Sequence, residues 1–420
     1  MPKNITSVEW QALYIPPGLA FDQATGTFTG APGEAGDFTV PVTVTTNYGT
    51  DTKNVLVKVD EGEEIIDASN SRYITECVDN GSEIIFFGNY NNGTRGIFFT
   101  YNPVTETKSE TFDISDGRPL TVNDVGDTSE NFSFKKVAID PISKKWVAFF
   151  GSHYVRTPEG IKDLGSEVDL AIIGLCWANN LQKFCVISDN RTYSFGNAHH
   201  DYTSYLFDVD GNLLASSKQL NEIDNFNLHG KALSWSDTAN KFAAVSSTMI
   251  SSSRPYRVTV YSSDGLSWSS SVISDSQYNS QRKAYETESL ITIDDGSFIL
   301  VSTLLYQDNS TLSVGRGTGI LKSSDGISWT RYNKQITYEA WTAAWSSSKG
   351  KIYAVTNNNI LHETTNFTDW TQVKEISNIA INHDLYSTSG NPSPIKMIWS
   401  DTVNALIIPA LKNEFYIVNV

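Results

Sequence analysis

The stretch YSSDGLSW, residues 261–268, returns almost letter for letter as KSSDGISW at 322–329. Both copies read Ser-Ser-Asp-Gly-x-Ser-Trp. They combine a carboxylate that accepts backbone N–H groups with a glycine that tolerates a positive φ, which is typical of a tight turn between strands. Because the chain contains this turn twice, we expect it to be built from a structural repeat.

A second pattern supports the repeat. Trp235 and Phe242 stand seven residues apart and flank the polar segment SDTAN. The same step links Trp177 to Phe184, Trp345 to Ile352, Trp399 to Leu406 and Ile139 to Trp146, and more loosely Val78 to Ile85 and Ile291 to Phe298. Apolar strand, polar turn and apolar strand predict a β-hairpin whose bulky residues face each other across the pair. We expect hairpins to begin near residues 78, 139, 177, 235, 291, 345 and 399.

The quoted turn follows these hairpins once per unit. Weaker versions are RTPEGIKDL (156–164), FDVDGNLL (207–214), TTNFTDW (364–370) and YNPVTETK (101–108). Each unit therefore has four strands, with this turn between the third and the fourth, and units of this kind form β-propeller blades. The sequence predicts an all-β protein with a seven-bladed β-propeller over residues 61–420. Only three strands follow Trp399, so we expect the strand EEIIDAS, 63–69, to complete the last blade and close the ring.

The repeated turn resembles the Asp-box, or BNR repeat, of sialidase-like propellers. The resemblance implies a structural role at Ser262, Asp264, Gly265 and Trp268 and again at Ser323, Asp325, Gly326 and Trp329. In the family the motif lies between the third and fourth strands of a blade. Repeat motifs of this kind mostly maintain packing between units. The motif is thus a sign of fold and only a weak sign of catalysis.

Residues 1–60 do not share the blade pattern. Apolar and polar residues alternate from Phe38 to Val44 and from Val55 to Val59, which predicts a small antiparallel β-sandwich. The run PPGLAFDQATGTFTGAPGEAGDFTVPVTV resembles the Ig-like modules of bacterial and phage surface proteins. That resemblance implies a spacer or docking unit without catalytic activity. DEGEEI, 60–65, is interpreted as a short acidic hinge.

Composition narrows the classes of partner. The chain has 420 residues and a net charge of −16, which disfavours nucleic acid and anionic membrane surfaces as partners. No apolar run is long enough for a membrane helix, and the first residues lack the pattern of a secretory signal. The three cysteines, Cys77, Cys176 and Cys185, indicate free thiols rather than a disulfide framework.

The search for catalytic chemistry yields no candidates. The Arg-Ile-Pro element of sialidases is absent, and Ser71-Arg72-Tyr73 does not replace it. Adjacent residues of an extended segment point to opposite sides, so His199-His200-Asp201 is interpreted as a loop and not as a ligand set. In DVDGN, 208–212, the glycine stands too early for a calcium loop. We expect no catalytic residues, no metal and no cofactor.

Long loops are the better place to look for binding. Connections between second and third strands and between blades share one face of a propeller. Here they include 88–95, 188–202, 247–256, 274–288 and 302–319. The candidate ligand-binding residues on this face are Tyr193, His200, Tyr202, Arg254, Tyr256, Tyr278, Tyr306 and Arg316. Tyrosine with arginine is a mixture that stacks on sugars or anchors a protein partner, although ordinary solvated loops remain the alternative.

These observations lead to one functional hypothesis and two rivals. We expect a non-enzymatic structural or adhesion protein of a bacteriophage particle, such as a fibre, baseplate or capsid-attached protein. It would fold in the host cytoplasm, join other virion proteins through the Ig-like module within a larger assembly, and bind a partner protein or host surface glycan. The rivals are a secreted glycan-active hydrolase of the sialidase-like type and a bacterial surface lectin, which would both act outside the cell or at its surface.

Overall fold

The fold consists of β-strands in two compact units that divide between Glu64 and Ile65. The computed structural model describes residues 8–15, 19–30, 36–59, 64–65, 72–90, 95–109, 111–117, 132–165, 168–190, 192–194, 197–223, 233–245, 257–273, 288–307, 314–336, 338, 340–356, 358–376, 396–409 and 415–420. Within these ranges the one helical segment is a short 3₁₀ helix, η2 (Gln219–Glu222). None of the described helical segments is long and apolar enough to cross a membrane.

The N-terminal unit has a three-stranded antiparallel sheet and a separate hairpin. The sheet order is β1 (Val8–Ala12), β4 (Gly36–Thr46) and β5 (Gly49–Val59), and the hairpin is β2 (Leu19–Asp22) with β3 (Thr27–Gly30). Alternation along β4 buries Val40 and Val42 on one face, as the sequence pattern predicts. The rings of Phe21 and Phe28 pack at a centroid distance of 5.0 Å across the hairpin.

The second unit repeats a four-stranded antiparallel sheet whose strands pair in chain order. The first sheet has β7 (Arg72–Asp79), β8 (Ile84–Tyr90), β9 (Arg95–Asn102) and β10 (Thr107–Lys108), with β11 (Phe112–Asp113) also paired to β9. The second has β12 (Phe134–Ile139), β13 (Trp146–Phe150), β14 (Tyr154–Thr157) and β15 (Gly160–Asp163). The third has β16 (Ile172–Ala178), β17 (Lys183–Asp189), β20 (Tyr202–Phe207) and β21 (Leu213–Ser217), and the hairpin of β18 (Thr192–Ser194) and β19 (Asn197–His199) extends from it.

The remaining sheets follow the same plan. The fourth sheet has β22 (Leu233–Ser236), β23 (Lys241–Val245), β24 (Arg257–Ser262) and β25 (Ser269–Ile273). The fifth has β26 (Glu288–Thr292), β27 (Phe298–Gln307), β28 (Val314–Ser323) and β29 (Thr330–Ile336). The sixth sheet has β30 (Ala340–Ser346), β31 (Lys351–Thr356), β32 (Ile360–Thr364) and β33 (Thr371–Glu375). The last sheet has β34 (Ile398–Ser400), β35 (Ala405–Pro409) and β36 (Phe415–Val418).

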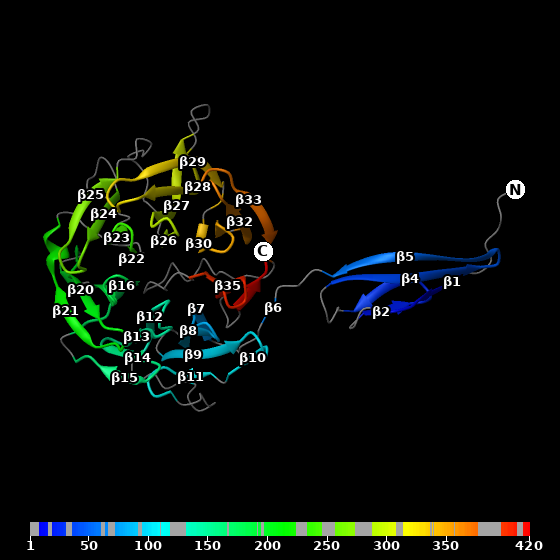
Figure 1. The fold of residues 1–420 in the computed structure, drawn as a ribbon, viewed down its shortest axis with the longest axis horizontal. Helices are drawn as coiled ribbons and strands as arrows, with labels where there is room; N and C mark the ends of the chain where they lie inside the picture. Colours follow the sequence, from blue (N-terminus) through cyan, green and yellow to red (C-terminus); the bar gives the residue numbers. More distant parts are fainter. Residues whose placement is uncertain are drawn as a thin grey trace. The chain divides into compact units, whose positions relative to one another are not determined.

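The first strands of these sheets form a closed circle. Contacts run from β7 through β12, β16, β22, β26, β30 and β34, and from β34 back to β7. The later strands of each sheet lie progressively farther from the centre (Figure 1). Sheets that radiate from a ring of first strands are the arrangement of a β-propeller.

The fourth strand of the last sheet comes from the other end of the propeller sequence. β6 (Glu64–Ile65) lies next to β36 in the order β34-β35-β36-β6. It belongs to the segment 63–69 that the sequence analysis assigns to this place. The first and last strands of the propeller sequence therefore share one sheet.

The residue pairs that the seven-residue spacing predicts can be compared with the strand pairing in the first hairpin of each sheet. Trp235 pairs with Phe242, and the partners expected for Trp177, Trp345, Trp399, Ile139 and Val78 are also confirmed. The expectation for Ile291 is wrong by one residue, because Ile291 pairs with Ile299, and Phe298 pairs with Thr292. The connection there spans Ile293 to Ser297 and contains Gly296 at φ +81°, so its length shifts the register.

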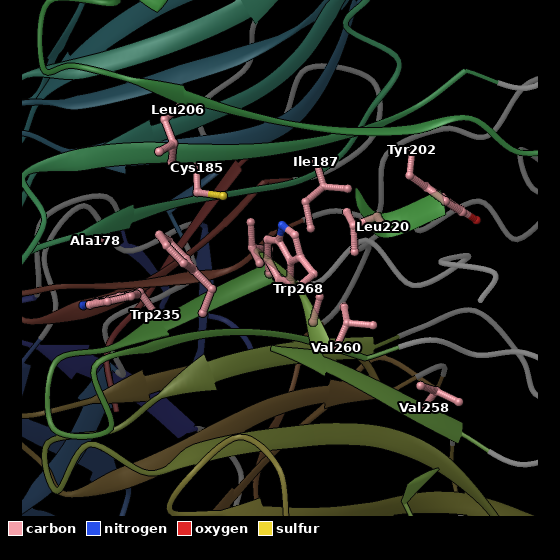
Figure 2. Packing of buried hydrophobic residues seen from close by; sticks show 13 residues of the cluster. Ala178, Cys185, Ile187, Tyr202, Leu206, Leu220, Trp235, Val258, Val260 and Trp268 are labelled. Atoms are coloured by element: carbon pink, nitrogen blue, oxygen red, sulfur yellow. The ribbon is translucent and has the colours of Figure 1, made fainter. Parts of the chain in front are cut away.

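Apolar clusters fill the spaces between neighbouring sheets. Figure 2 shows the cluster between the third and fourth sheets of the ring, where Cys185 and Leu206 come from one sheet and Trp235, Val260 and Trp268 from the other. Corresponding clusters join the other sheets, including the last sheet to the first, where Phe86 and Phe415 pack at a centroid distance of 4.0 Å. In these clusters each sheet buries its apolar faces against the two neighbouring sheets, as in repeat proteins generally.

Side chains also satisfy the open inner edges of the first strands. Glu76 Oε2 accepts the backbone N–H of Val137 at 3.0 Å, and Thr342 Oγ1 accepts that of Met397 at the same distance. Ser289 Oγ accepts the N–H of Ala343 at 3.1 Å. In each case an oxygen from one sheet supplies the acceptor that the edge strand of the next sheet lacks. A buried edge N–H without a partner would be costly, so these contacts stabilise the ring.

Candidate functional site

The repeated turn makes the same hydrogen bonds in both copies. Ser262 Oγ accepts the N–H of Gly265 at 2.8 Å and donates to Asp264 Oδ1 at 2.9 Å. Asp264 Oδ1 also accepts the N–H groups of Leu266 and Ser267 at 2.8 and 2.7 Å. The corresponding distances in the second copy, built on Ser323 and Asp325, are 2.9, 3.0, 2.8 and 2.8 Å.

The aspartates of the two turns are held as structural acceptors. Burial on its own would raise the pKa of Asp264, but hydrogen bonds from Ser267, Leu266 and Ser262 outweigh it and leave the pKa below its ordinary value. The pKa of Asp325 is lowered in the same way. A carboxylate already satisfied by its own turn is a poor general acid or base at neutral pH.

The same turns fasten each sheet to the preceding one. Gly265 adopts φ +77°, and a Cβ there would lie 2.8 Å from Leu206 Cδ2 of the preceding sheet. Trp268 is buried, and its Nε1 donates to Ser204 Oγ at 3.2 Å, again in the preceding sheet. In the second copy, Thr259 Oγ1 donates to the carbonyl of Gly326 at 2.8 Å. Both turns thus contact the preceding sheet of the ring as well as joining their own two strands.

A third, degenerate copy of the turn occurs at 364–370. Thr364 replaces the serine, Asn366 the aspartate and Phe367 the glycine. Asn366 Oδ1 accepts the N–H groups of Thr368 and Asp369 at 3.0 and 2.8 Å, and Thr364 Oγ1 accepts that of Phe367 at 3.1 Å. Phe367 adopts φ +65°, which is unusual for a residue with a side chain. The hydrogen-bond pattern is thus retained although the sequence motif has faded.

The face of the propeller opposite these turns carries the connections between the second and third strands of each sheet. The best described is the connection from β17 to β20, where His200 lies against Asp189. His200 Nδ1 is 2.9 Å from Asp189 Oδ2 and 3.0 Å from Oδ1, and the Asp189 side chain is 2% exposed. The imidazole stacks on the Tyr202 ring at 5.5 Å with an interplanar angle of 4°. A buried carboxylate and an aromatic ring thus fix the orientation of a half-buried histidine.

A second polar group adjoins this pair. Asp201 Oδ2 accepts from Lys218 Nζ at 2.9 Å, and Asp201 Oδ1 accepts from Asn221 Nδ2 at 2.8 Å. Asn221 also binds the Tyr202 backbone, accepting its N–H at 2.6 Å and donating to its carbonyl at 3.1 Å. Lys218 and Asn221 come from the segment that joins the third sheet to the fourth. We call Asp189, His200, Asp201, Lys218 and Asn221 the loop-face cluster.

The structure corrects one candidate residue and locates others. Tyr202 was expected to be exposed for binding, but it is 2% exposed, because it begins β20 and its ring packs in the cluster of Figure 2. Tyr193 lies in β18, and Tyr306 and Arg316 lie in the β27–β28 hairpin. In that hairpin Leu305 pairs with Arg316 and Tyr306 with Gly315, so the two candidates are close along the ladder. Arg254, Tyr256 and Tyr278 lie outside the described residues.

Sequence reasoning missed four members of the loop-face cluster, and only Asp201 is a neighbour of His200 in the chain. Asp189 ends an apolar strand, and Lys218 and Asn221 follow the fourth strand of the sheet, so no local motif connects them with His200. The pairing of Asp189 with Tyr202 in the β17–β20 ladder is what brings the carboxylate next to His200. A correct strand register would have been the signal.

Among the residues that the structure describes, no group of three or more His, Cys, Asp or Glu side chains could hold a metal ion. In DVDGN, Asp208 Oδ1 accepts the N–H groups of Asp210 and Asn212 at 3.0 and 2.8 Å, which is the predicted turn. The three cysteines are free thiols, as expected, and burial raises their pKa well above the ordinary value.

Comparisons with known proteins agree with this two-part fold. Residues 4–60 match the family model described as "Putative Ig domain". No curated protein matches the sequence. The solved structure of Raptor from Chaetomium thermophilum is 9% identical, with a TM-score of 0.50 over 84% of this chain and 28% of Raptor.

Two further solved structures are similar. The WD40 β-propeller domain of Doa1 is 11% identical, with a TM-score of 0.47 over 84% of this chain and 95% of that domain. The β-propeller domain of Cps50 (Swd1) from Myceliophteria thermophila is 10% identical, with a TM-score of 0.45 over 86% and 100%. These two similarities carry no statement about function. The match over residues 4–60 and the circle of four-stranded sheets together describe an N-terminal Ig-like module followed by a β-propeller.

Proposed function

We propose that this chain is a non-enzymatic structural or adhesion protein of a bacteriophage particle. In this proposal an Ig-like β-sandwich joins other virion proteins, and a seven-bladed, Asp-box-type β-propeller binds a partner protein or a host surface glycan with its loop face. The closed circle of first strands and the shared sheet of β6 and β36 support the blade count. The acidic composition and the free cysteines suit a chain that folds in a reducing compartment.

The observation that carries the binding role is the loop-face cluster. Its His200 ring is 15% exposed and already oriented by Asp189 and Tyr202, so binding would order few further groups. Asp201, Lys218 and Asn221 add exposed hydrogen-bonding groups beside it. A small number of polar groups held in fixed positions is the usual means by which a site orients a sugar or a protein partner.

A binding screen with matched variants tests this role. The full chain is applied to an array of bacterial surface glycans and to candidate host envelopes. We expect binding that His200→Ala and Lys218→Glu weaken at least tenfold, while Lys349→Glu, in an exposed turn on the opposite face, leaves it unchanged. If all three variants bind like the parent, the cluster is not the contact surface, and the absence of any binding would reject the adhesion role.

One observation favours a second candidate, a glycan-active hydrolase. A buried carboxylate on Nδ1 of a histidine is the arrangement that orients a general base. Incubation with a panel of polysaccharides separates the two functions. Product release that Asp189→Asn abolishes would establish the hydrolase, and binding without turnover supports the proposal above.

A further inference from the structure

The N-terminal module has a long strand at the edge of its sheet. β5 runs over eleven residues, and its pairing with β4 is regular from Thr46–Gly49 to Gly36–Val59. In the described part of the chain no strand pairs with its outer side. Residues 51–55 are all exposed. Proteins usually protect such edges with short strands, proline, bulges or charged side chains; β5 is long and has no proline or bulge, and it carries the charges of Asp51 and Lys53.

The turn fixes which backbone groups face outward. Asn47 and Tyr48 form a two-residue connection that closes on the Thr46–Gly49 pair. In such a hairpin the closing pair exchanges both hydrogen bonds, and every second residue after it does the same. Gly49, Asp51 and Lys53 therefore direct their N–H and C=O groups to β4, and Thr50, Thr52 and Asn54 direct theirs to the open edge.

The charges on this edge are self-complementary. Asp51 and Lys53 lie on one face of β5, one on each side of Thr52. A two-fold axis perpendicular to the sheet leaves each face of the sheet on the same side in both copies. It therefore places odd-numbered residues opposite odd-numbered residues and even-numbered residues opposite even-numbered ones. With this axis at Thr52, Asp51 stands opposite Lys53 of a second copy, and Lys53 opposite its Asp51. The backbone N–H and C=O groups of Thr50 then lie opposite those of Asn54 in the second copy, in position to form hydrogen bonds.

From this geometry we propose that β5 is a homotypic docking strand. Two copies of the chain pair their β5 strands antiparallel, with Thr52 on the two-fold axis, and form one continuous six-stranded sheet with the order β1-β4-β5-β5-β4-β1. This inference goes beyond the proposed function, because it concerns the N-terminal module and does not depend on what the loop face binds.

The expected affinity of this contact is low. It joins about seven residues of each strand through backbone hydrogen bonds and two exposed ion pairs, and such pairs each contribute little. A dissociation constant in the micromolar range or weaker is expected. Within an assembly that holds many copies close together, the same contact would be strengthened by effective concentration.

Charge reversal tests the contact on the full chain. Sedimentation velocity at increasing protein concentration should show a reversible monomer–dimer equilibrium. Asp51→Lys and Lys53→Asp should each weaken dimerisation several-fold, because each creates like-charged pairs, and the double variant should restore it. The double variant controls for misfolding of either single one. A chain that stays monomeric up to about 0.1 mM, or a double variant no better than the single ones, would overturn the proposal.

Cysteine cross-linking tests the register. With a short bismaleimide as the thiol cross-linker, Thr52→Cys should give a covalent dimer, because the two copies of position 52 face each other across the axis at about 5.5 Å between Cα atoms. Asn54→Cys, which faces Thr50 of the second copy, is the matched control and should remain monomeric. Cross-linking at position 54 in place of position 52 would show a different register, and no cross-linking at either position would reject strand pairing.

Discussion

Ser400 Oγ donates a hydrogen bond of 2.6 Å to Asp79 Oδ2, although the two residues stand 321 positions apart in the chain. Thr402 Oγ1 donates to the other carboxylate oxygen, also at 2.6 Å. Asp79 ends the first strand of the first sheet, and Ser400 and Thr402 lie in the corresponding hairpin of the last one. One carboxylate thus fastens the seam at which the ring closes.

Asp79→Ala should lower the free energy of unfolding by about 1–3 kcal/mol, because it leaves the two hydroxyl donors without their acceptor. Urea denaturation measures the loss. Glu375→Ala, at an exposed position of β33 in the same propeller, is the control and should change stability by less than about 0.5 kcal/mol. Equal effects of the two variants would show that the seam contact contributes nothing.

The Asp79 contribution should also depend on pH. Burial by itself would raise the pKa of Asp79, but hydrogen bonds from Ser400, Thr402 and Gly81 outweigh it and lower the pKa. The stabilisation is therefore present above the ordinary carboxyl range, about pH 4, and is lost as the pH falls through the lowered value. The difference between parent and Asp79→Ala should shrink in acid, and a difference that stays constant would contradict this account.

His362 should make the propeller less stable in mild acid. It is buried in β32, its Nε2 has no hydrogen-bond partner among the described residues, and burial lowers its pKa. The folded state resists protonation while the unfolded chain accepts it, so stability should fall as the pH drops below about 6.5.

The matched variant for this test is His362→Leu. Two residues before the turn, where β32 has His362, the equivalent strands have Val260 and Leu321. The substitution should raise stability and reduce the loss between about pH 7.5 and about pH 5.5, measured by urea denaturation at each pH. An unchanged pH profile would mean that His362 is not the group responsible.

Thr259→Val should cost about 1 kcal/mol of stability, because it removes the hydroxyl that donates to the Gly326 carbonyl while keeping the side-chain shape. Thr371→Val, on the exposed start of β33, is the control for the substitution itself. Thermal or urea unfolding of both variants measures the difference. A cost at Thr371 as large as that at Thr259 would assign the effect to the threonine and not to the contact between sheets.

Alanine at the motif glycines should destabilise in a definite order. Both glycines have a positive φ, which costs a residue with a Cβ about 1–2 kcal/mol. At Gly265 the new Cβ would also lie 2.8 Å from Leu206 Cδ2, whereas at Gly326 the closest atom, Ala243 Cβ, is 3.2 Å away. Gly265→Ala should therefore be the more damaging in an unfolding titration. The reverse order would indicate that Leu206 moves away freely.

The parts of the fold that the sequence predicts are those encoded by neighbouring residues. Trp235 and Phe242 flank one short turn, so their spacing alone specifies the pair. Ser262 and Asp264 likewise bond within their own turn. Such contacts depend on local geometry and leave a pattern that can be recognised wherever it recurs.

The parts that the sequence does not predict depend on register between distant strands. Asp189 reaches His200 only because β17 pairs with β20 across the intervening hairpin. Tyr202 is buried for the same reason, although a tyrosine after two histidines and an aspartate resembles an exposed loop residue. The hydrogen bond from the Val137 N–H to Glu76 Oε2 joins two sheets, and no sequence pattern near either residue indicates it.

Because β6 and β36 lie side by side in one sheet, the chain could begin and end at a different sheet of the propeller without changing the ring. A gene in which a short linker joins Val420 to Glu64, with new ends opened in the exposed turn at Ser348–Gly350, should encode the same ring. Circular permutation would then place the Ig-like module at a different blade. The blade to which the Ig-like module is attached is therefore set by the order of segments in the gene and not by the ring itself.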